Sequence, residues 1–255
     1  MSEAHQGDPG SKGGSHCIVL LPAYNEAANL PRVVQEAYRV LGSNLRVVVV
    51  VDDGSTDKTS EVITTLQKSY SVHVERHIQN MGLARALDTG FRVARGMIDS
   101  DDVVITMDAD GTQPAETMTE MTQRVRADAD VVIASRYVPG GRQSGVPLIR
   151  ILLSAAINRM LRARFRIPAK DCTSGYRAYS GKLIRQMVPE GVDRFLSSTG
   201  FEASFELLCR ASRLTASISE VPLMLDYSAR EGKSKMRVGN TIYNYLNLLF
   251  APKSF

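Results

Sequence analysis

The sequence predicts an α/β protein with a mostly parallel sheet and flanking helices, and three observations support this prediction. Short apolar runs alternate with segments whose apolar residues recur at helical spacing throughout residues 16–135. Five consecutive valines, Val47 to Val51, are typical of a strand buried on both faces, as in parallel sheets. Polar segments follow the first, second and fourth apolar runs, and ligands bind at the carboxyl ends of parallel strands.

Each expected strand is a short apolar run that ends at a turn residue or a polar segment. The first run ends at Pro22, the second at Asp52 and the fourth at Asp108. The expected strands cover residues 16–21, 46–51, 72–76, 103–107, 130–135 and 218–221.

Apolar residues three or four positions apart predict the helices. The first helix is expected to begin near Asn25 and Glu26 and to end at Gly42. The other helices are expected at residues 59–69, 82–97, 114–126, 147–165 and 200–212, with a short one from Gly181 and an amphipathic one in the tail.

Composition indicates a soluble globular chain with anionic partners. The 255 residues are 44% hydrophobic and 23% charged, with a net charge of +4. Three widely spaced cysteines argue against a zinc or disulfide framework and favour a reducing compartment. No apolar run reaches the roughly 20 residues that a membrane span needs. The polar residues 1–15 are interpreted as a disordered leader rather than a signal peptide.

The polar segment after the fourth expected strand is the leading candidate site. Asp108 and Asp110 lie two positions apart there, and Gly111 follows. Carboxylate oxygens suit a hard divalent cation that also binds phosphate, although Asp and Gly also favour plain turns. A phosphatase nucleophile at a strand end is another interpretation of this pair. No GxGxxG follows the first strand, and no GxxxxGK[ST] occurs, which argues against a dinucleotide site and excludes a P-loop.

The second half of the chain differs in charge. Residues 131–170 contain eight basic residues and no acidic one. The helix expected at 147–165 therefore suits an anionic membrane surface or is a core helix with a solvated basic face, and the pattern alone favours the latter. Nucleic acid is not favoured as a partner, because aromatic residues do not interleave with the charges.

Seven motifs stand out along nearly the whole chain: LPAYNE (21–26), DDGSTD (52–57), NMGLA (80–84), DADG (108–111), SRY (135–137), DCTSGYR (171–177) and GKSK (232–235). Together, and in this order, they resemble a family 2 glycosyltransferase of GT-A fold, most closely the dolichol- or polyprenyl-phosphate mannose synthase type. The resemblance implies a Rossmann-like GT-A domain over 16–230, with a nucleotide-sugar half (16–135) and an acceptor half (136–230). A basic and apolar tail (231–255) would follow.

The resemblance implies a nucleotide-sugar site with Mg²⁺ or Mn²⁺ on the donor diphosphate. Gly82 alternatively marks a plain helix start, and Asp52 and Asp57 suit a turn and a helix cap. The family often has Gln two residues after its second metal-binding Asp, but here Thr112 stands there, so water or Gln113 is expected as third ligand. The implied donor residues are Pro22, Ala23, Tyr24, Glu26, Asp53, Gly82, Asp108, Ala109 and Asp110, with Asp108, Asp110 and Gln113 at the metal.

The implied acceptor is a lipid phosphate, which is an ionised nucleophile that needs positive charge rather than a general base. Asp110, Arg136, Arg150 and Lys235 are expected to be catalytic. Glu202, Glu206 and Glu220 would orient these cations or serve the structure, and the latter is favoured. The residues expected at the acceptor phosphate are Arg136, Arg150, Arg177, Arg230, Ser234 and Lys235.

The implied activity is inverting transfer of a hexose, foremost mannose from GDP-mannose, to polyprenyl or dolichyl phosphate. Alternatives are transfer from UDP-glucose or UDP-GlcNAc to polyprenyl phosphate or to a soluble acceptor, and a non-catalytic nucleotide-sugar-binding subunit. With the family in view, the 147–165 helix and the tail helix become membrane-interface elements. We therefore expect a cytoplasmic enzyme, peripheral at the cytosolic face of a membrane, with a membrane-anchoring partner subunit as one possible tether.

Overall fold

The computed structural model describes residues 15–214, 217–227 and 244–245. The expected leader, apart from Ser15, lies outside these residues, and so does the tail helix apart from Asn244 and Tyr245. Arg230, Ser234 and Lys235 also lie outside the described residues.

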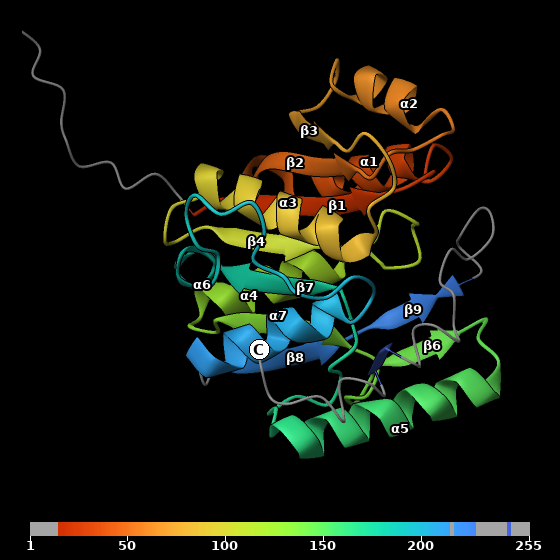
Figure 1. Cartoon of the computed structure of the whole chain (residues 1–255), viewed down its shortest axis with the longest axis vertical. Helices are drawn as coiled ribbons and strands as arrows, with labels where there is room; N and C mark the ends of the chain where they lie inside the picture. The colour runs from red at the N-terminus through yellow and green to blue at the C-terminus, as the bar shows by residue number, and fades with distance from the viewer. Residues whose placement is uncertain (1–14, 215–216, 228–243, 246–255) are drawn as a thin grey trace, which may run out of the picture.

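Seven of the described strands form one twisted sheet, and the predicted α/β class is confirmed (Figure 1). The strand order is β3-β2-β1-β4-β7-β5-β8. All neighbours are parallel except that β7 runs antiparallel to β4 and β5. Their bounds are β1 Cys17–Ala23, β2 Leu45–Asp52, β3 Val72–Arg76, β4 Val103–Thr106, β5 Val131–Ser135, β7 Arg177–Ser180 and β8 Ile218–Pro222.

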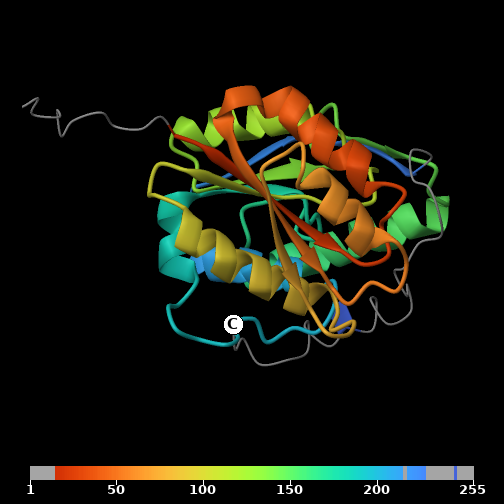
Figure 2. The same ribbon diagram turned by 90° about the horizontal axis from the view of Figure 1, so that it is seen from above.

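Helices cover both faces of this sheet (Figure 2). Because strand side chains alternate, Val48 and Val50 pack with α1, α2 and α4, whereas Val49 and Val51 face α3, α6 and α7. The valine run is therefore buried on both faces, as the sequence predicted. The helices are α1 Leu30–Leu41, α2 Thr59–Leu66, α3 Leu83–Met97, α4 Thr117–Arg126, α5 Leu148–Phe165, α6 Gly181–Met187 and α7 Ala203–Leu214.

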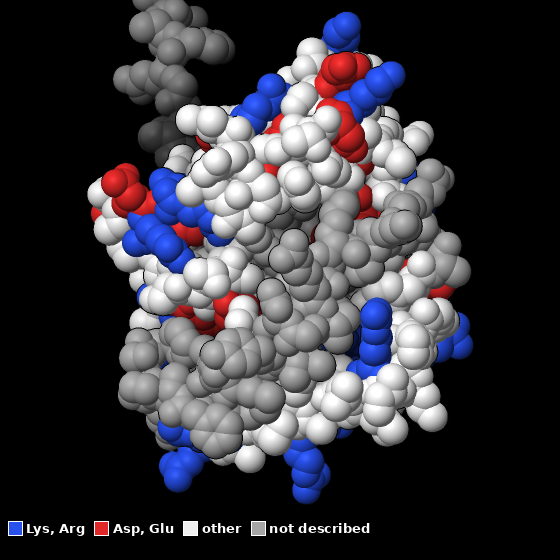
Figure 3. Space-filling view, turned by 45° about the vertical axis from the view of Figure 1, so that its right-hand side comes forward, with Lys and Arg blue, Asp and Glu red and all other residues white. Residues whose placement is uncertain are grey.

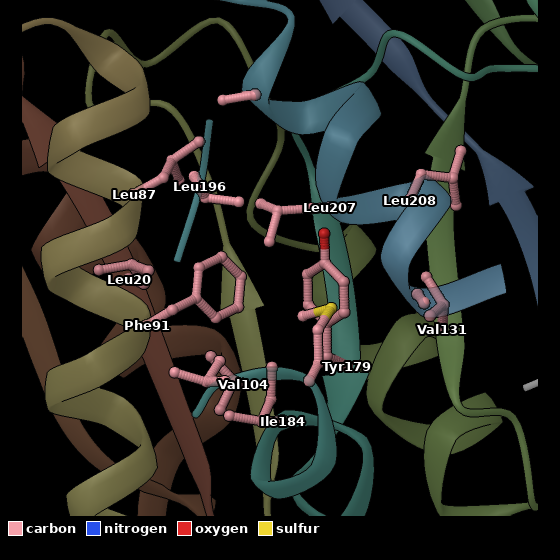
Figure 4. Close-up of a cluster of buried hydrophobic side chains, with 14 of the residues drawn as sticks. Leu20, Leu87, Phe91, Val104, Val131, Tyr179, Ile184, Leu196, Leu207 and Leu208 are labelled. Atoms are coloured by element: carbon pink, nitrogen blue, oxygen red, sulfur yellow. The ribbon is translucent and has the colours of Figure 1, made fainter. Parts of the chain in front are cut away.

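The core on the α3 side is tightly packed around aromatic rings (Figure 4). Phe91 of α3 meets Tyr179 of β7 edge to face, with ring centroids 5.3 Å apart. A Cβ on Gly90 would lie 2.2 Å from a methyl group of Leu20. Helix α3 therefore lies close against β1, and this contact holds the start of α3 near the carboxyl ends of the strands.

Three features differ from the sequence prediction. Strand β7 fills the middle of the sheet, and a short parallel pair, β6 (Arg142–Ser144) and β9 (Met224–Asp226), lies outside it. Strand β1 continues past Pro22, because β4 has already ended on the side that the missing N–H would face. Helix α1 begins only at Leu30, because Asn25 has a positive φ and its side chain accepts hydrogen bonds from the 56–57 backbone.

Strands β1, β2 and β4 end at one edge of the sheet, which is the edge that carries the three predicted polar segments. Within the described residues, no helix has the length and apolar character required to cross a membrane.

Candidate functional site

A cavity of about 950 Å³ opens at this edge. It reaches from the ends of β1, β2 and β4 to the start of α5, so one continuous space joins the two halves of the chain. Every described residue predicted for the donor, the metal or the acceptor lines it, except Arg177. These residues are Pro22, Ala23, Tyr24, Glu26, Asp53, Gly82, Asp108, Ala109, Asp110, Gln113, Arg136 and Arg150.

Asp53 organises one end of the cavity. Its Oδ1 accepts a hydrogen bond from the N–H of Met81 at 2.9 Å, and its Oδ2 accepts one from the N–H of Gly82 at 2.8 Å. Gly82 has φ +89°, and a Cβ there would lie 2.9 Å from the carbonyl oxygen of Thr199. Only glycine therefore fits this point, where the backbone that precedes α3 meets the 199–200 segment.

The neighbouring acidic residues support the loop itself. Asp52 is buried and accepts hydrogen bonds from the Ser55 N–H and the Ser60 hydroxyl, and it pairs with Arg76. Burial alone would raise the pKa of Asp52, but these hydrogen bonds and the nearby charge outweigh it and lower the pKa. Asp57 accepts the Thr59 N–H at the start of α2. Their expected roles in a turn and a helix cap are confirmed.

Asp108 and Gln113 form a closed pair of hydrogen bonds. The Gln113 Nε2 donates to Asp108 Oδ2 at 2.8 Å, and the Asp108 N–H donates to Gln113 Oε1 at 3.0 Å. Both ends of the Gln113 amide are thus directed at Asp108. Gln113 therefore orients Asp108 in this structure, and its expected role as a metal ligand stays a prediction.

Asp110 is held in the same turn. Its Oδ1 accepts from the N–H of Thr112 at 3.1 Å and from its hydroxyl at 2.7 Å. Among the described residues, no group of three His, Cys, Asp or Glu side chains is placed to hold a metal. The two carboxylates nevertheless fit Mg²⁺ or Mn²⁺, because these hard ions are commonly held by one or two carboxylates together with phosphate oxygens.

Arg136 lines the cavity, and its positive charge is paired with the carboxylate of Asp171. Its guanidinium donates two hydrogen bonds to the carboxylate of Asp171, with Nε 2.8 Å from Oδ2 and Nη2 2.7 Å from Oδ1. Nη2 also donates to the Thr173 hydroxyl at 2.7 Å. Burial alone would raise the pKa of Asp171, but the charge and hydrogen bonds of Arg136 lower it. The pair therefore stays ionised, and much of the positive charge of Arg136 is neutralised within the wall.

Arg177 does not reach the cavity, so its expected contact with an acceptor phosphate is corrected. The residue belongs to β7 and is fully buried. Its Nη2 donates to the carbonyl oxygen of Cys172 at 2.8 Å, and its Nη1 donates to that of Ser204. A buried arginine that donates to backbone carbonyls in the core stabilises the fold and has no access to a ligand.

Arg150 lines the cavity in the first turn of α5. It is exposed, and its side chain makes no hydrogen bond or ion pair with the described residues. Arg136 and Arg150 are the basic residues among the described ones that line the cavity. Because Asp171 compensates Arg136, Arg150 supplies the uncompensated positive charge of this described wall.

Helix α5 buries one narrow side and exposes the rest. Its buried residues are Ile157, Asn158 and Leu161. A 100° turn per residue places Leu152 opposite this side of the helix and places Leu153 and Met160 beside it. Figure 3 shows basic and no acidic side chains along the bottom of the view, where α5 lies in Figure 1. The exposed apolar side chains are Leu148, Ile149, Leu152, Leu153 and Met160, with exposures of 40 to 70%.

Three carboxylates in the second half of the chain hold backbone segments, of which Glu202 and Glu206 are buried and Glu220 of β8 is partly buried. Glu202 accepts from the N–H groups of Thr199 and Gly200, Glu206 accepts from those of Ser197 and Ser198, and Glu220 accepts from those of Lys170 and Asp171. All three hold backbone, which confirms the structural role favoured for them.

The sequence interpretation gave no role to several wall residues. Asn80, Thr173 and Ser174 lie in the NMGLA and DCTSGYR motifs, which carried a usable signal, whereas no pattern in the sequence places Thr199, Gly200 and Tyr245 at this cavity. Asp171, which is fully buried beside Arg136, also carried a signal as the first acidic residue after the stretch 131–170.

A mostly parallel sheet with Asp108 and Asp110 just beyond β4, at the edge where the cavity opens, is the arrangement expected of a glycosyltransferase of the GT-A class. The sequence model of Glycosyl transferase family 2 matches residues 18–188, and the chain belongs to this family.

Relatives with known names support the same assignment. The chain is 34% identical to a dolichol-phosphate mannosyltransferase of Pyrococcus furiosus over 91% of its own length and 62% of the relative's, so it spans less than two thirds of that protein. It is 34% identical to the polyprenol monophosphomannose synthase of Mycolicibacterium smegmatis, covering 88% of this chain and 82% of the relative. The undecaprenyl-phosphate mannosyltransferase of Micrococcus luteus is 33% identical, with 89% and 91% covered.

Solved structures confirm the fold. Glucosyl-3-phosphoglycerate synthase from Mycobacterium tuberculosis, in complex with Mn²⁺, UDP and its product, superposes with a TM-score of 0.66. The alignment covers 94% of this chain and 82% of that one at 19% identity. The same enzyme with Mg²⁺ and UDP gives a TM-score of 0.63 at 17% identity, again over 94% and 82% of the two chains.

Proposed function

We propose that this chain transfers a mannosyl residue from GDP-mannose to a polyprenyl or dolichyl phosphate. One observation carries the proposal: a single cavity joins the Asp108 and Asp110 carboxylates to the uncompensated charge of Arg150 and to apolar residues of α5. A donor diphosphate suits the first end, and a lipid phosphate suits the second. The names of the mannosyltransferase relatives support this choice of sugar and acceptor.

The donor would occupy the end lined by Pro22, Tyr24 and Asp53, with its diphosphate near Asp108 and Asp110. Carboxylate oxygens can accept hydrogen bonds from the N–H groups of a base. Asp108 and Asp110 would hold Mg²⁺ or Mn²⁺. When bound, such an ion neutralises charge on the leaving nucleoside diphosphate. The complexes of the solved structures with Mn²⁺ or Mg²⁺ and UDP support this metal assignment.

The acceptor phosphate needs no base, because its second pKa is about 6 and it is largely ionised at neutral pH. One phosphate oxygen attacks the anomeric carbon, and a new carbon–oxygen bond forms. The bond to the donor diphosphate breaks, and its electron pair leaves with the nucleoside diphosphate. A single displacement of this kind inverts the anomeric centre. Arg150 would hold the phosphate in line for attack, and Arg136 with Asp171 would form the fixed wall beside it.

Helix α5 would bring the enzyme to its lipid substrate at the cytosolic face of a membrane. Its exposed apolar residues, its basic residues Arg159 and Arg162, and Arg166 directly after it suit an interface between acyl chains and anionic headgroups. The absence of acidic residues over 131–170 supports the same orientation. This contact would be peripheral, and whether a partner subunit adds an anchor stays a prediction.

Radiolabelled donors test the proposal. The protein is incubated with Mn²⁺, polyprenyl phosphate and either GDP-mannose, UDP-glucose or UDP-GlcNAc, and lipid is extracted into organic solvent. Label from GDP-mannose in the organic phase is the expected result. Label from a UDP-sugar would change the donor, and label confined to the aqueous phase would overturn the lipid acceptor. Tight nucleotide binding without turnover would make the chain a non-catalytic subunit.

A further inference from the structure

We propose that His77 is a positioning residue for donor binding, because its imidazole fixes the carboxylate of Asp53. This inference deepens the proposed function and rests on it only for the identity of the ligand. His77 follows β3 directly, and its side chain is 10% exposed. It does not line the cavity itself, so it would act through Asp53.

The imidazole is held on both sides. Its Nδ1 lies 2.7 Å from Oδ1 of Asp53, and its Nε2 lies 3.0 Å from the hydroxyl of Thr89 on α3. The His77 N–H also donates to the carbonyl oxygen of Asp52 at 2.9 Å. The ring therefore adds a second link between the end of β2 and α3, beside the hydrogen bond from the Gly82 N–H to Asp53.

The surrounding hydrogen bonds define which nitrogen carries the proton. The ionised carboxylate of Asp53 can only accept, so Nδ1 of His77 must carry the hydrogen of the 2.7 Å contact. Nε2 can then accept from the Thr89 hydroxyl. The neutral ring then carries its proton on Nδ1 and donates it to Asp53. His77 is thus a directional donor to Asp53 rather than a space-filling ring.

The carboxylate of Asp53 holds a strap of backbone, residues 77–82, against the cavity. Its Oδ1 takes the His77 and Met81 donors, and its Oδ2 takes the N–H of Gly82. The strap lies so close that a Cβ on Gly54 would be 2.3 Å from the carbonyl carbon of Gln79. A carboxylate has about four acceptor positions, so one position on Oδ2 is left for a donor on the nucleotide. Losing the His77 hydrogen bond would free the carboxylate to turn away from that orientation.

Paired variants separate positioning from packing. The side-chain nitrogen of His77→Asn can occupy the place of Nδ1 and keep the donor to Asp53, whereas His77→Gln reaches toward Thr89 instead. His77→Leu removes both contacts. His73→Gln, at a more exposed histidine of β3 that contacts Glu75, is the matched control. GDP and UDP are titrated in the presence of Mn²⁺, and kcat and KM are measured for each substrate.

We expect His77→Asn and His73→Gln to bind nucleotide within about twofold of wild type, and His77→Gln and His77→Leu about tenfold more weakly, the scale of one hydrogen bond to a charged group. In His77→Gln and His77→Leu the KM of the donor should rise by a similar factor, and the KM of the acceptor and kcat should change little. Equal binding by the Asn and Gln variants, or wild-type binding by His77→Leu, would overturn the inference.

Hydrogen exchange of the Met81 and Gly82 amides gives a readout that needs no ligand. Both amides should stay protected in His77→Asn and exchange faster in His77→Leu, and equal protection in all variants would overturn the inference. If the variants show these exchange differences but the wild-type protein transfers no mannose, the proposed function is refuted while the role of His77 is supported.

Discussion

Arg136 and Asp171 form a two-pronged ion pair in the wall of the cavity, with nitrogen–oxygen distances of 2.8 and 2.7 Å. Asp171 is fully buried, and the side chain of Arg136 is 12% exposed. The pair converts a residue that resembles a phosphate ligand into a largely compensated part of the wall. It therefore divides the predicted cationic residues into two kinds, one structural and one available to a ligand.

Replacing Asp171 should destabilise the protein strongly. Asp171→Asn leaves the charge of Arg136 without its partner, and breaking a buried pair costs roughly 3–5 kcal/mol. Glu190→Gln, which removes an ion pair with Arg95 whose carboxylate is 74% exposed, should cost about 1 kcal/mol or less. Urea unfolding of both variants measures the difference. A cost for Asp171→Asn as small as that of Glu190→Gln would mean that the pair is not formed.

The same pair predicts how stability changes with pH. The pKa of Asp171 is lowered in the folded protein, so its contribution is fully present above the ordinary aspartate pKa of about 3.9. The contribution is lost as the pH falls through the lowered folded value. The difference in unfolding free energy between wild type and Asp171→Asn should therefore be largest at neutral pH and shrink in acid. A difference that stays constant down to pH 3 would contradict this.

Arg150 should affect the acceptor without affecting the fold. Because its side chain is exposed and makes no ion pair with described residues, Arg150→Ala should leave the melting temperature unchanged. The KM for a short-chain polyprenyl phosphate should rise about tenfold or more, since one charged contact to phosphate contributes roughly 1.5–3 kcal/mol. The KM for the donor should stay the same. Arg159→Ala, on the same helix but away from the cavity, is the control, and an equal effect there would point to general electrostatic attraction.

Gln113 should tune metal binding through Asp108. Gln113→Ala removes both hydrogen bonds that orient this carboxylate, and losing such an outer contact typically costs about 10–100-fold in metal affinity or activity. Activity should return at high Mn²⁺ concentration, because Asp108 and Asp110 remain. Gln123→Ala on the exposed side of α4 controls for the substitution itself. Failure of excess Mn²⁺ to restore activity would instead favour direct ligation by Gln113.

The exposed face of α5 should control binding to membranes. Ile149 and Leu152 are 63% and 58% exposed, and replacing both with Ser removes apolar area from the proposed interface. Affinity for vesicles with anionic lipid should fall about tenfold or more, on the scale of about 1.5–3 kcal/mol per buried side chain. Leu214→Ser, at an equally apolar exposed site on α7, should have little effect. Equal losses at both sites would show that α5 is not the contact surface.

Local patterns were enough to predict the strand ends and the polar residues that follow them. Asp53, Asp108 and Tyr24 each follow a recognisable strand, and parallel strands bring their carboxyl ends to one edge. The helix cap at Asp57 was equally predictable, since an N-cap depends on residues a few positions apart.

Contacts between distant segments were not predictable in the same way. Strand β7 enters the sheet between β4 and β5, and this buries Arg177 although its sequence context suggested a ligand contact. The partner of Arg136 lies 35 residues away, and that of His77 lies 24 residues back along the chain. No periodicity links such pairs, because the order of the strands in the sheet decides which side chains meet.

By itself the sequence determined the α/β class, the alternation of strands and helices, and the position of Asp108 and Asp110 at a strand end. These features depend on neighbouring residues and on the two periods of backbone structure. The tertiary structure alone decided which cations are available. It compensated Arg136 with Asp171, buried Arg177 and left Arg150 at the cavity, because a charge is defined by what surrounds it in space and not by its place in the chain.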